Sequence, residues 1–315
     1  MFSKKLNFLF MMMLTIGLAF TMTSCDDDSD DIIGGIDDTD SITNNLGDDD
    51  RFEMLSDALE RVNLDDVLEQ DGPFTIFAPT DAAFDALGVD LNTLSDEQLT
   101  EILLYHVLGA EVMSTDLSEG QTYATTASEN GPENEQLSIL IERSGNAVTL
   151  NGNVNVTDAD LESKNGVIHA VDAVLMPQDI VDAALANDQF TELTGALGAA
   201  SGDLVNVLKG TGPFTVFAPT NAAFEAISET TATLTADQLR DVLLYHVVAG
   251  NVRAEDLSDD MEVTTQNGDT FMINIDGSNV SITDSNDNSI NVLLTNVQTT
   301  NGVIHVIDGV LLPTS

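Results

Sequence analysis

Hydrophobic and polar residues alternate along this chain in short blocks that predict strands and helices in turn. Residues 74–78 read Phe-Thr-Ile-Phe-Ala and follow a Gly-Pro pair, a composition and a start that are typical of a β-strand. Pro79 ends this run, and Thr80 can cap a helix that begins at Asp81. The pattern therefore predicts a strand that is followed directly by a helix.

A second helix is predicted to begin near Ser95. Ser95 and Gln98 have the spacing of a capping box, in which each side chain bonds to the backbone of the other residue. The positions that follow repeat at i, i+3, i+4 and i+7: Leu99, Ile102, Leu103 and His106. Such a stripe is typical of a helix that packs one face against a core.

Three blocks occur twice in the same order. They are residues 72–87 and 212–227, residues 103–108 and 243–248, and residues 165–177 and 301–313. The first pair is identical at 12 of 16 positions at an offset of 140 residues. A period of this length predicts two tandem globular domains, because solenoid repeats are far shorter. We place the domains at residues 41–177 and 178–315.

The last block of each domain predicts a hairpin. Asn165-Gly166 and Asn301-Gly302 are typical turn pairs, and each is followed by a strand that is apolar on both faces and therefore interior. Between the helix and this strand lies a polar stretch, rich in Thr and Gly, that predicts further short strands. The expected fold class is α+β.

These three blocks, in this order and twice, resemble the fasciclin domain over residues 41–313. The resemblance implies that each domain is a wedge of about seven strands with helices packed around it. It also implies adhesion outside the cell, by proteins that bind matrix, other cells or surface polymers. The family is not known as one of enzymes.

The N-terminal segment predicts export. Residues 1–24 combine a positive start, an apolar run and a small-residue end, which is the pattern of a secretory signal peptide. Cys25, the only cysteine, follows directly, and this arrangement resembles a bacterial lipoprotein signal, in which the cysteine is lipidated and becomes the first residue of the mature chain. Met22 stands where that pattern prefers Leu. The alternative is an ordinary signal peptide with an incidental cysteine.

An acidic segment follows Cys25. Eight of the fifteen residues 26–40 are Asp and none is basic, so charge repulsion is expected to keep residues 25–40 as an extended, disordered tether. This run also resembles the signal that sends lipoproteins of Bacteroidota to the cell surface, whereas in enteric bacteria an Asp after the cysteine indicates inner-membrane retention. Because the run is long, we expect anchoring in the outer membrane with display at the cell surface. The lipidated N-terminus would be the only membrane contact.

The net charge limits the classes of partner. The chain has 9 Lys and Arg against 54 Asp and Glu, which gives 9 − 54 = −45. Such a surface repels phosphate backbones, so we expect no nucleic-acid partner. A single cysteine excludes a disulfide framework and a cysteine-built zinc site.

All four histidines of the chain lie in the repeated blocks. One interpretation is a catalytic or metal site in each domain, and the other is a structural role inside the fold. A metal site needs three or four ligands in a defined geometry, and no two histidines stand at helical spacing. We therefore expect His169 and His305 to be structural, and we expect neither a metal ion nor another cofactor.

No catalytic residue is expected either. The chain has no Gly-x-Ser-x-Gly elbow, and among 54 acidic residues two carboxylates are expected to lie close together by chance. The spacing of Asp284, Asn286 and Asn288 resembles the start of a calcium loop, but Ser289 stands where that loop requires Gly.

The resemblance implies two candidate adhesion motifs. One is a Tyr-His pair between branched apolar residues, and the other is an Asp-Ile pair near the end of a domain. These motifs correspond here to Tyr105-His106, Tyr245-His246 and Asp179-Ile180. For the Tyr-His pairs, core packing is the alternative, since a helix that is apolar on both sides of the pair is also what a core requires.

Two functions from different classes stay open on the sequence alone. The first is a cell-surface lipoprotein that adheres to an extracellular protein or polysaccharide without chemistry of its own. The second is a carbohydrate- or small-ligand-binding protein that serves nutrient uptake. Sugar sites usually offer aromatic platforms, and the absence of Trp together with only 3 Tyr weakens the second function.

Overall fold

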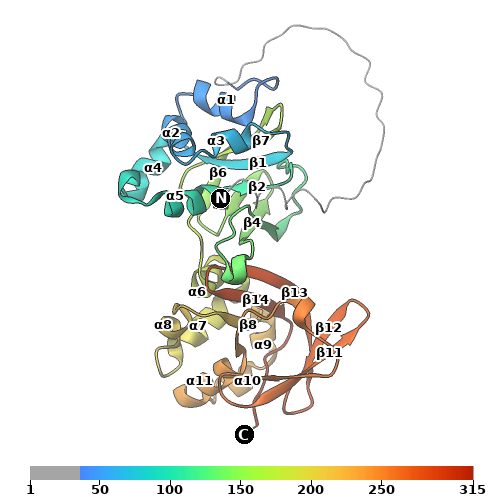
Figure 1. Ribbon diagram of the computed structural model, residues 1–315. Coiled ribbons are helices and arrows are strands. Elements are labelled where there is room, and N and C mark those ends of the chain that lie inside the picture. Colours follow the sequence, from blue (N-terminus) through green and yellow to red (C-terminus); the bar gives the residue numbers. More distant parts are fainter. Residues whose placement is uncertain (1–35, 315) are drawn as a thin grey trace. The chain divides into compact units, whose positions relative to one another are not determined.

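The structure of this protein is a computed structural model that describes residues 36–314 (Figure 1). The predicted signal peptide, Cys25 and the tether up to residue 35 lie outside the described residues. The end of the predicted tether belongs to the first domain. Ile36 is 7% exposed and packs into a core, and the side-chain amide of Asn45 donates to the carbonyl oxygen of Asp37 at 2.8 Å.

The first domain contains five α-helices and seven strands. In chain order they are α1 (Ile42–Asp48), α2 (Glu53–Arg61), α3 (Asp65–Leu68), β1 (Phe74–Pro79), α4 (Asp81–Leu87), α5 (Asp96–Tyr105), β2 (Val107–Leu108), β3 (Gly120–Thr125), β4 (Ser138–Ser144), β5 (Ala147–Leu150), β6 (Val154–Ser163) and β7 (Gly166–Val171). The sheet order is β2-β1-β7-β6-β5-β4-β3. The neighbours β1 and β7 run parallel, and the other strand pairs are antiparallel.

The second domain repeats this arrangement. Its helices are α6 (Ile180–Ala186), α7 (Thr191–Ala199), α8 (Leu204–Leu208), α9 (Asn221–Ala226), α10 (Ser228–Thr231) and α11 (Ala236–Tyr245). Its strands are β8 (Phe214–Pro219), β9 (Val247–Ala249), β10 (Met261–Thr264), β11 (Thr270–Asp276), β12 (Asn279–Thr283), β13 (Ser289–Thr299) and β14 (Gly302–Ile307). The sheet order is β10-β11-β12-β13-β14-β8-β9. The predicted α+β class with seven strands in each domain is confirmed.

The helices begin where their caps predict. The hydroxyl of Thr80 accepts from the amide of Ala83 at the start of α4, and Ser95 and Gln98 form both bonds of a capping box at the start of α5. Thr235 and Gln238 form the same box before α11. These caps satisfy amide groups that have no partner inside the helix.

Each sheet separates two hydrophobic clusters. In the first domain, Ile76 and Ile168 face a cluster that contains residues of α1, α2, α4 and α5, whereas Phe77 and Val171 face a cluster built from β4 to β6. All six residues of β7 are buried, as are all six residues of β14. The last strand of each domain is therefore interior, as the apolar sequence on both faces predicts.

The hairpins are present, but their turns differ by one residue from the prediction. Ser163 pairs with Gly166, so the two turn residues are Lys164 and Asn165, and Gly166 is the first residue of β7. The second domain has the same register, with Thr299 opposite Gly302. The reason lies in close packing: a Cβ atom on Gly166 would stand 2.0 Å from the carbonyl oxygen of Phe74 on β1.

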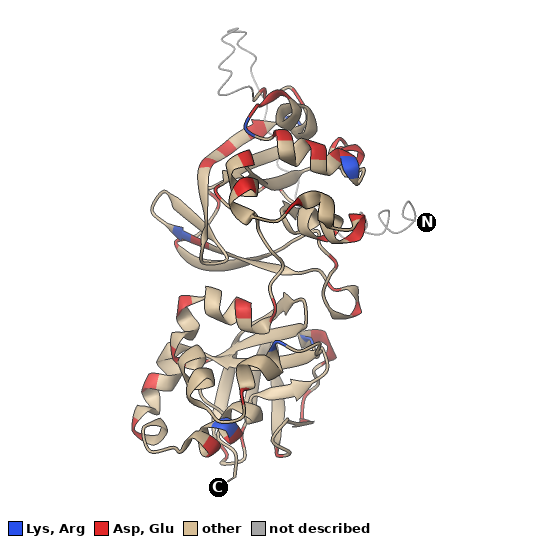
Figure 2. Cartoon of the chain, turned by 90° about the vertical axis from the view of Figure 1, so that its left-hand side faces the viewer, with Lys and Arg blue, Asp and Glu red and all other residues tan. Residues whose placement is uncertain are grey.

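Acidic residues cover both domains, with few basic residues among them (Figure 2). Residues 36–314 contain 49 acidic and 7 basic residues, which gives 7 − 49 = −42. Six of these bases already form ion pairs within the described part of the chain: Arg51, Arg61, Arg143, Lys209, Arg240 and Arg253. Most of the negative charge therefore has no internal counterion.

We expect the melting temperature to rise with ionic strength. Salt shortens the Debye length from about 10 Å at 0.1 M to about 3 Å at 1 M and so screens the repulsion among the carboxylates. Calorimetric melts over this range measure the effect, with sucrose at matched osmolarity as the control. A melting temperature that does not change with salt would contradict a destabilising role for the acidic surface.

Candidate functional site

The two Tyr-His pairs lie inside their domains. Tyr105 is the last residue of α5 and His106 is its C-cap, and their side chains are 0% and 1% exposed. Tyr245 and His246 occupy the same places at the end of α11 and are 0% and 2% exposed. An extracellular ligand cannot reach either pair in the folded domain.

His106 joins the end of α5 to the segment that follows β7. Its Nε2 atom accepts a hydrogen bond from the amide of Leu175 at 2.9 Å. Because Nε2 accepts, the ring proton stands on Nδ1, which donates to the carbonyl oxygen of Ile102 at 2.7 Å. His246 makes the same two bonds, to Leu311 at 2.9 Å and to Val242 at 2.8 Å.

Burial holds both imidazoles neutral. It lowers the pKa of His106 from 6.5 to about 4, although the hydrogen bond to Ile102 acts in the opposite direction. The pKa of His246 is lowered to about 4 for the same reason. A proton on Nε2 would also break the bond from the amide of Leu175 or Leu311.

We expect the free energy of unfolding to decrease as the pH falls from 6.5 to about 4. In this window the unfolded chain protonates both histidines and the folded chain does not, so protons stabilise the unfolded state. The stability that the neutral rings contribute is fully present above pH 6.5 and is lost as the pH falls through about 4. The shift corresponds to about 3 kcal/mol for each histidine.

Denaturant melts at a series of pH values measure this slope. They are repeated at about 1 M NaCl, because protonation of surface carboxylates relieves repulsion in the same window and acts in the opposite direction. A stability that stays constant or rises between pH 6.5 and 4 in high salt would contradict buried neutral rings.

The tyrosine hydroxyl of each pair bonds to a strand of the sheet. The hydroxyl of Tyr105 donates to the carbonyl oxygen of Ser138 on β4 and accepts from the amide of Asn151, both at 3.0 Å. Burial raises the pKa of Tyr105 to about 12. The hydroxyl of Tyr245 donates to the carbonyl oxygen of Thr270 on β11 at 2.7 Å. Each pair therefore ties its helix to the sheet, as the core-packing alternative for these residues predicts.

His169 and His305 are also internal. His169 stacks on Phe77 with 5.7 Å between the ring centroids, and its Nε2 atom donates to the carbonyl oxygen of Val112 at 2.8 Å. Its Nδ1 atom accepts from the amide of Asp160 at 3.1 Å. His305 stacks on Phe217 at 5.2 Å in the same way. Burial lowers the pKa of both histidines below the ordinary value of 6.5.

Ser114, Asp160 and His169 lie together, but their bonds do not activate a nucleophile. The hydroxyl of Ser114 donates to the carboxylate of Asp160 and not to the ring of His169. A nucleophilic serine instead needs its hydroxyl bonded to the base. In the second domain Asn296 takes the place of Asp160, and its backbone amide likewise donates to Nδ1 of His305. The two domains therefore share the hydrogen bond from this backbone amide to the histidine ring, and they do not share the carboxylate.

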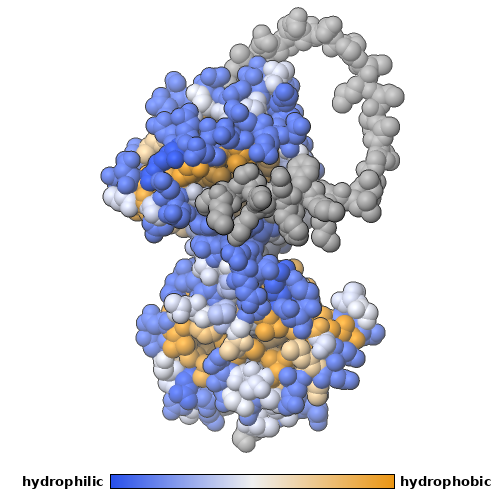
Figure 3. Space-filling model, in the orientation of Figure 1, coloured by the Kyte–Doolittle hydropathy of each residue, from blue (hydrophilic) through white to orange (hydrophobic). Residues whose placement is uncertain are grey.

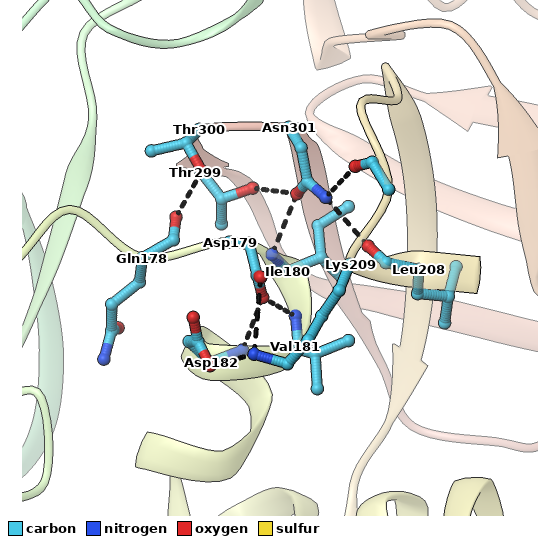
Figure 4. Close-up of polar contacts among 11 residues, drawn as sticks. Gln178, Asp179, Ile180, Val181, Asp182, Leu208, Lys209, Thr299, Thr300 and Asn301 are labelled. Carbon is cyan, nitrogen blue, oxygen red and sulfur yellow. Dashed lines mark hydrogen bonds and ion pairs between the residues drawn. The ribbon is translucent and has the colours of Figure 1, made fainter. Parts of the chain in front are cut away.

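The Asp179-Ile180 pair starts the first helix of the second domain (Figure 4). One carboxylate oxygen of Asp179 accepts from the amides of Val181 and Asp182, both at 2.8 Å, which caps α6. The other oxygen lies 3.5 Å from the ammonium group of Lys209. Ile180 is 2% exposed. The carboxylate and the apolar side chain therefore both have partners inside the domain.

The first domain has a matching pair at its own start. Ser41 caps α1 in the same way, and the amide of Ile42 donates to the side chain of Asn165 at 2.9 Å. In the second domain the amide of Ile180 donates to Asn301 at 3.0 Å. The Asp-Ile pair thus lies at the start of the second domain, whereas the adhesion motif that it resembles stands near the end of a domain.

Asn165 and Asn301, which the sequence predicts as turn residues, each bond to several segments of their domain. Asn165 also donates to the carbonyl oxygens of Leu68 and Gln70, at 2.6 and 2.9 Å, and so ties α1, α3 and β7 together. Asn301 makes the matching bonds to Leu208 and Gly210 (Figure 4). In the sequence, the only indication that these residues join distant segments is that both stand at the same position of the repeated block.

Asp284 does not begin a calcium loop. One of its carboxylate oxygens accepts from the amides of Asn286 and Asn288 at 2.9 Å, and the other accepts from the amide of Leu312 at 3.1 Å. These bonds hold the segment after β14 in place and occupy the oxygens that a cation would need. Among residues 36–314, no group of three or more His, Cys, Asp or Glu side chains could hold a metal ion.

Comparison with known proteins identifies the repeated unit. The family model of the fasciclin domain matches residues 50–177 and 188–313. Periostin of Homo sapiens is 28% identical over 258 residues, which cover 79% of this chain and 29% of periostin. Protein sll1483 of Synechocystis sp. is 39% identical over 139 residues, which cover 42% of this chain and 73% of that protein.

One solved structure also matches this chain. It is a FAS1 domain pair from the insect cell adhesion molecule fasciclin I, with a TM-score of 0.49 and 21% identity over 83% of this chain and 95% of that chain. Each helix among residues 36–314 is too short or too polar to span a lipid bilayer.

Proposed function

Because this chain belongs to the fasciclin-domain family, we propose that it is a non-enzymatic adhesion protein that binds an extracellular partner through the exposed surface of its domains. The Tyr-His motifs, which both domains contain, form their hydrogen bonds with groups inside each domain. Recognition therefore falls to side chains outside those motifs.

The charge of that surface supports the proposal and narrows the partner. A net charge of 7 − 49 = −42 over residues 36–314 attracts surfaces that present Lys and Arg and repels sulfated or uronic-acid polysaccharides. We therefore propose a basic extracellular protein as the partner. Charge complementarity of this kind raises the association rate and makes binding depend on salt.

Beads that carry the full chain test this function. They are placed on surfaces coated with basic matrix proteins, with acidic matrix proteins or with heparin, and beads that carry an unrelated protein of equal net charge are the control. We expect retention on the basic proteins alone, above that of the control beads, and a decrease as salt rises. Equal retention on heparin, or no difference from the control beads, would contradict the proposal.

We also propose that the protein is exported, lipidated at Cys25 and held at the outer membrane with its domains outside the cell. The apolar run that precedes Cys25 and the acidic run that follows it support this location. Cys25→Ala is expected to move the protein from the membrane fraction to the soluble exported fraction, because one thiol carries the lipid. Ser24→Ala is the matched control. A Cys25→Ala protein that stays in the membrane fraction after a high-salt wash would exclude lipid anchoring.

A further inference from the structure

An apolar groove lies on the first domain between α2, α4 and the segment that joins α4 to α5. Its volume is about 410 Å³, within the usual range of about 300–1,000 Å³ for binding sites. The apolar residues that line it are Met54, Ala58, Phe84, Val89, Leu91 and Leu99. Figure 3 shows hydrophobic residues on this part of the first domain within a hydrophilic surround.

The floor of the groove belongs to the core, and one wall is open to solvent. Phe84 and Leu99 are 3% and 1% exposed, whereas Val89 is 44% exposed. Val89 follows Gly88, which ends α4 in the left-handed conformation with φ of 65°. An apolar side chain that entered here would cover Val89 without displacing any residue of the core.

The rim of the groove is negatively charged. Asp57 on α2 and Asp85 on α4 are exposed and take part in none of the ion pairs of the described residues. Arg61, the one base in the lining, is already bound elsewhere. Its guanidinium donates to the carboxylate of Asp96 at 2.8 Å and to the carbonyl oxygens of Leu91 and Leu94, both at 2.8 Å. It therefore does not neutralise the rim.

The matching positions of the second domain are less apolar. The repeat places Glu192 opposite Met54, Ala199 opposite Arg61 and Glu229 opposite Val89. The second domain thus has acidic residues at two of the apolar lining positions, and Glu229 lies in the short helix α10, where the first domain has the non-helical segment of Val89. The apolar wall beside Val89 is therefore not repeated at the matching positions.

We propose that this groove is the docking site for a segment of a partner protein in which an apolar side chain is flanked by Lys or Arg. The inference rests on the adhesion function proposed above and names the kind of segment recognised. The apolar side chain would contact Val89 and Phe84, and the flanking cations would pair with Asp57 and Asp85. Apolar burial supplies the affinity and the charges supply orientation.

A synthetic peptide is the probe. It is an amphipathic helix of about 12 residues, with Leu on one face and Lys elsewhere. Two matched peptides replace Lys by Glu or Leu by Ser. The full chain is captured on a sensor surface through a C-terminal tag. We expect the Lys–Leu peptide to bind and both matched peptides to bind at least about tenfold more weakly. Equal binding of the Lys–Ser peptide would overturn the inference, since charge alone would then suffice.

Val89→Glu tests the groove itself, because it places a charge in the apolar wall. Leu185→Glu is its matched control, since Leu185 is 62% exposed on α6 and the substitution adds the same charge. Added negative charge alone would strengthen binding of a cationic peptide. We therefore expect Val89→Glu to weaken binding at least about tenfold and Leu185→Glu to change it less than twofold. Equal effects of the two variants would overturn the inference, and thermal melts establish that both proteins are folded.

The rim has its own matched pair of variants. Asp85→Asn is expected to lower the association rate of the peptide about threefold or more. Glu225→Gln, at the matching place on α9, is expected to change this rate by less than about threefold. Equal rates for the two variants would overturn the role of the rim.

The groove and the adhesion function can fail separately. Adhesion that is unchanged in Val89→Glu, while peptide binding is lost, would overturn the groove as the docking site and leave the adhesion function standing. If the peptide binds through the groove but beads that carry the chain are retained on no protein surface, the groove would be supported and the adhesion function overturned.

Discussion

Gly166→Ala and Gly302→Ala are each expected to prevent stable folding of their domain. A Cβ atom at these positions would stand 2.0 and 1.9 Å from the carbonyl oxygens of Phe74 and Phe214, which belong to the neighbouring parallel strand. The φ angles of 153° and 158° add backbone strain for any residue with a side chain. The strands that begin with these glycines, β7 and β14, cannot move away, because both are buried on two faces. We expect a loss of more than about 4 kcal/mol.

Denaturant melts of the full chain, followed by far-UV circular dichroism, measure this loss. Gly195→Ala is the matched control, since nothing lies within 4 Å of its Cβ position. In the middle of α7 this control is expected to raise stability by about 0.5–1 kcal/mol. A Gly302→Ala protein with an unchanged transition would show that β8 and β14 do not approach as closely as the structure has them.

His106→Ala and His246→Ala are expected to destabilise their domains by about 3 kcal/mol each. Each substitution leaves a cavity, one buried carbonyl group and one buried amide without partners. For His106 these are the groups of Ile102 and Leu175. Because the bonds are the same in both domains, the two losses should be alike.

Glu97→Ala is the control for this pair. Glu97 lies on the same helix as His106 but is exposed, so its loss should stay within about 0.5 kcal/mol. Free energies from denaturant melts give the comparison. If His106→Ala or His246→Ala changed stability no more than Glu97→Ala does, the imidazole would not hold the helix to the last strand of that domain.

Local patterns predicted much of the fold. The caps at Thr80 and Ser95, the apolar strands and the two repeats each depend on residues close together in the chain. The role of Asn165 could not be found in this way, because its partners Ile42 and Leu68 lie 123 and 97 residues away. Spacing alone cannot show which distant backbone group will face a side chain.

The candidate sites were harder to predict for the same reason. A Tyr-His pair at the end of an amphipathic helix fits an exposed ligand site and a packed core equally well. The difference is whether another part of the chain covers the rings, as β4 and the segment around Leu175 do here. The groove beside Val89 also depends on how α2 and α4 approach each other, which no local pattern describes.

We propose that the motifs shared by the two domains act inside the fold and leave recognition to the acidic exterior. Nuclear magnetic resonance titration of the histidine rings in the full chain tests it most directly. We expect His106 and His246 to stay neutral, with the proton on Nδ1, until the pH approaches about 4. Rings that titrate near the ordinary value of 6.5 in the folded protein would show instead that the histidines are open to water and to a ligand.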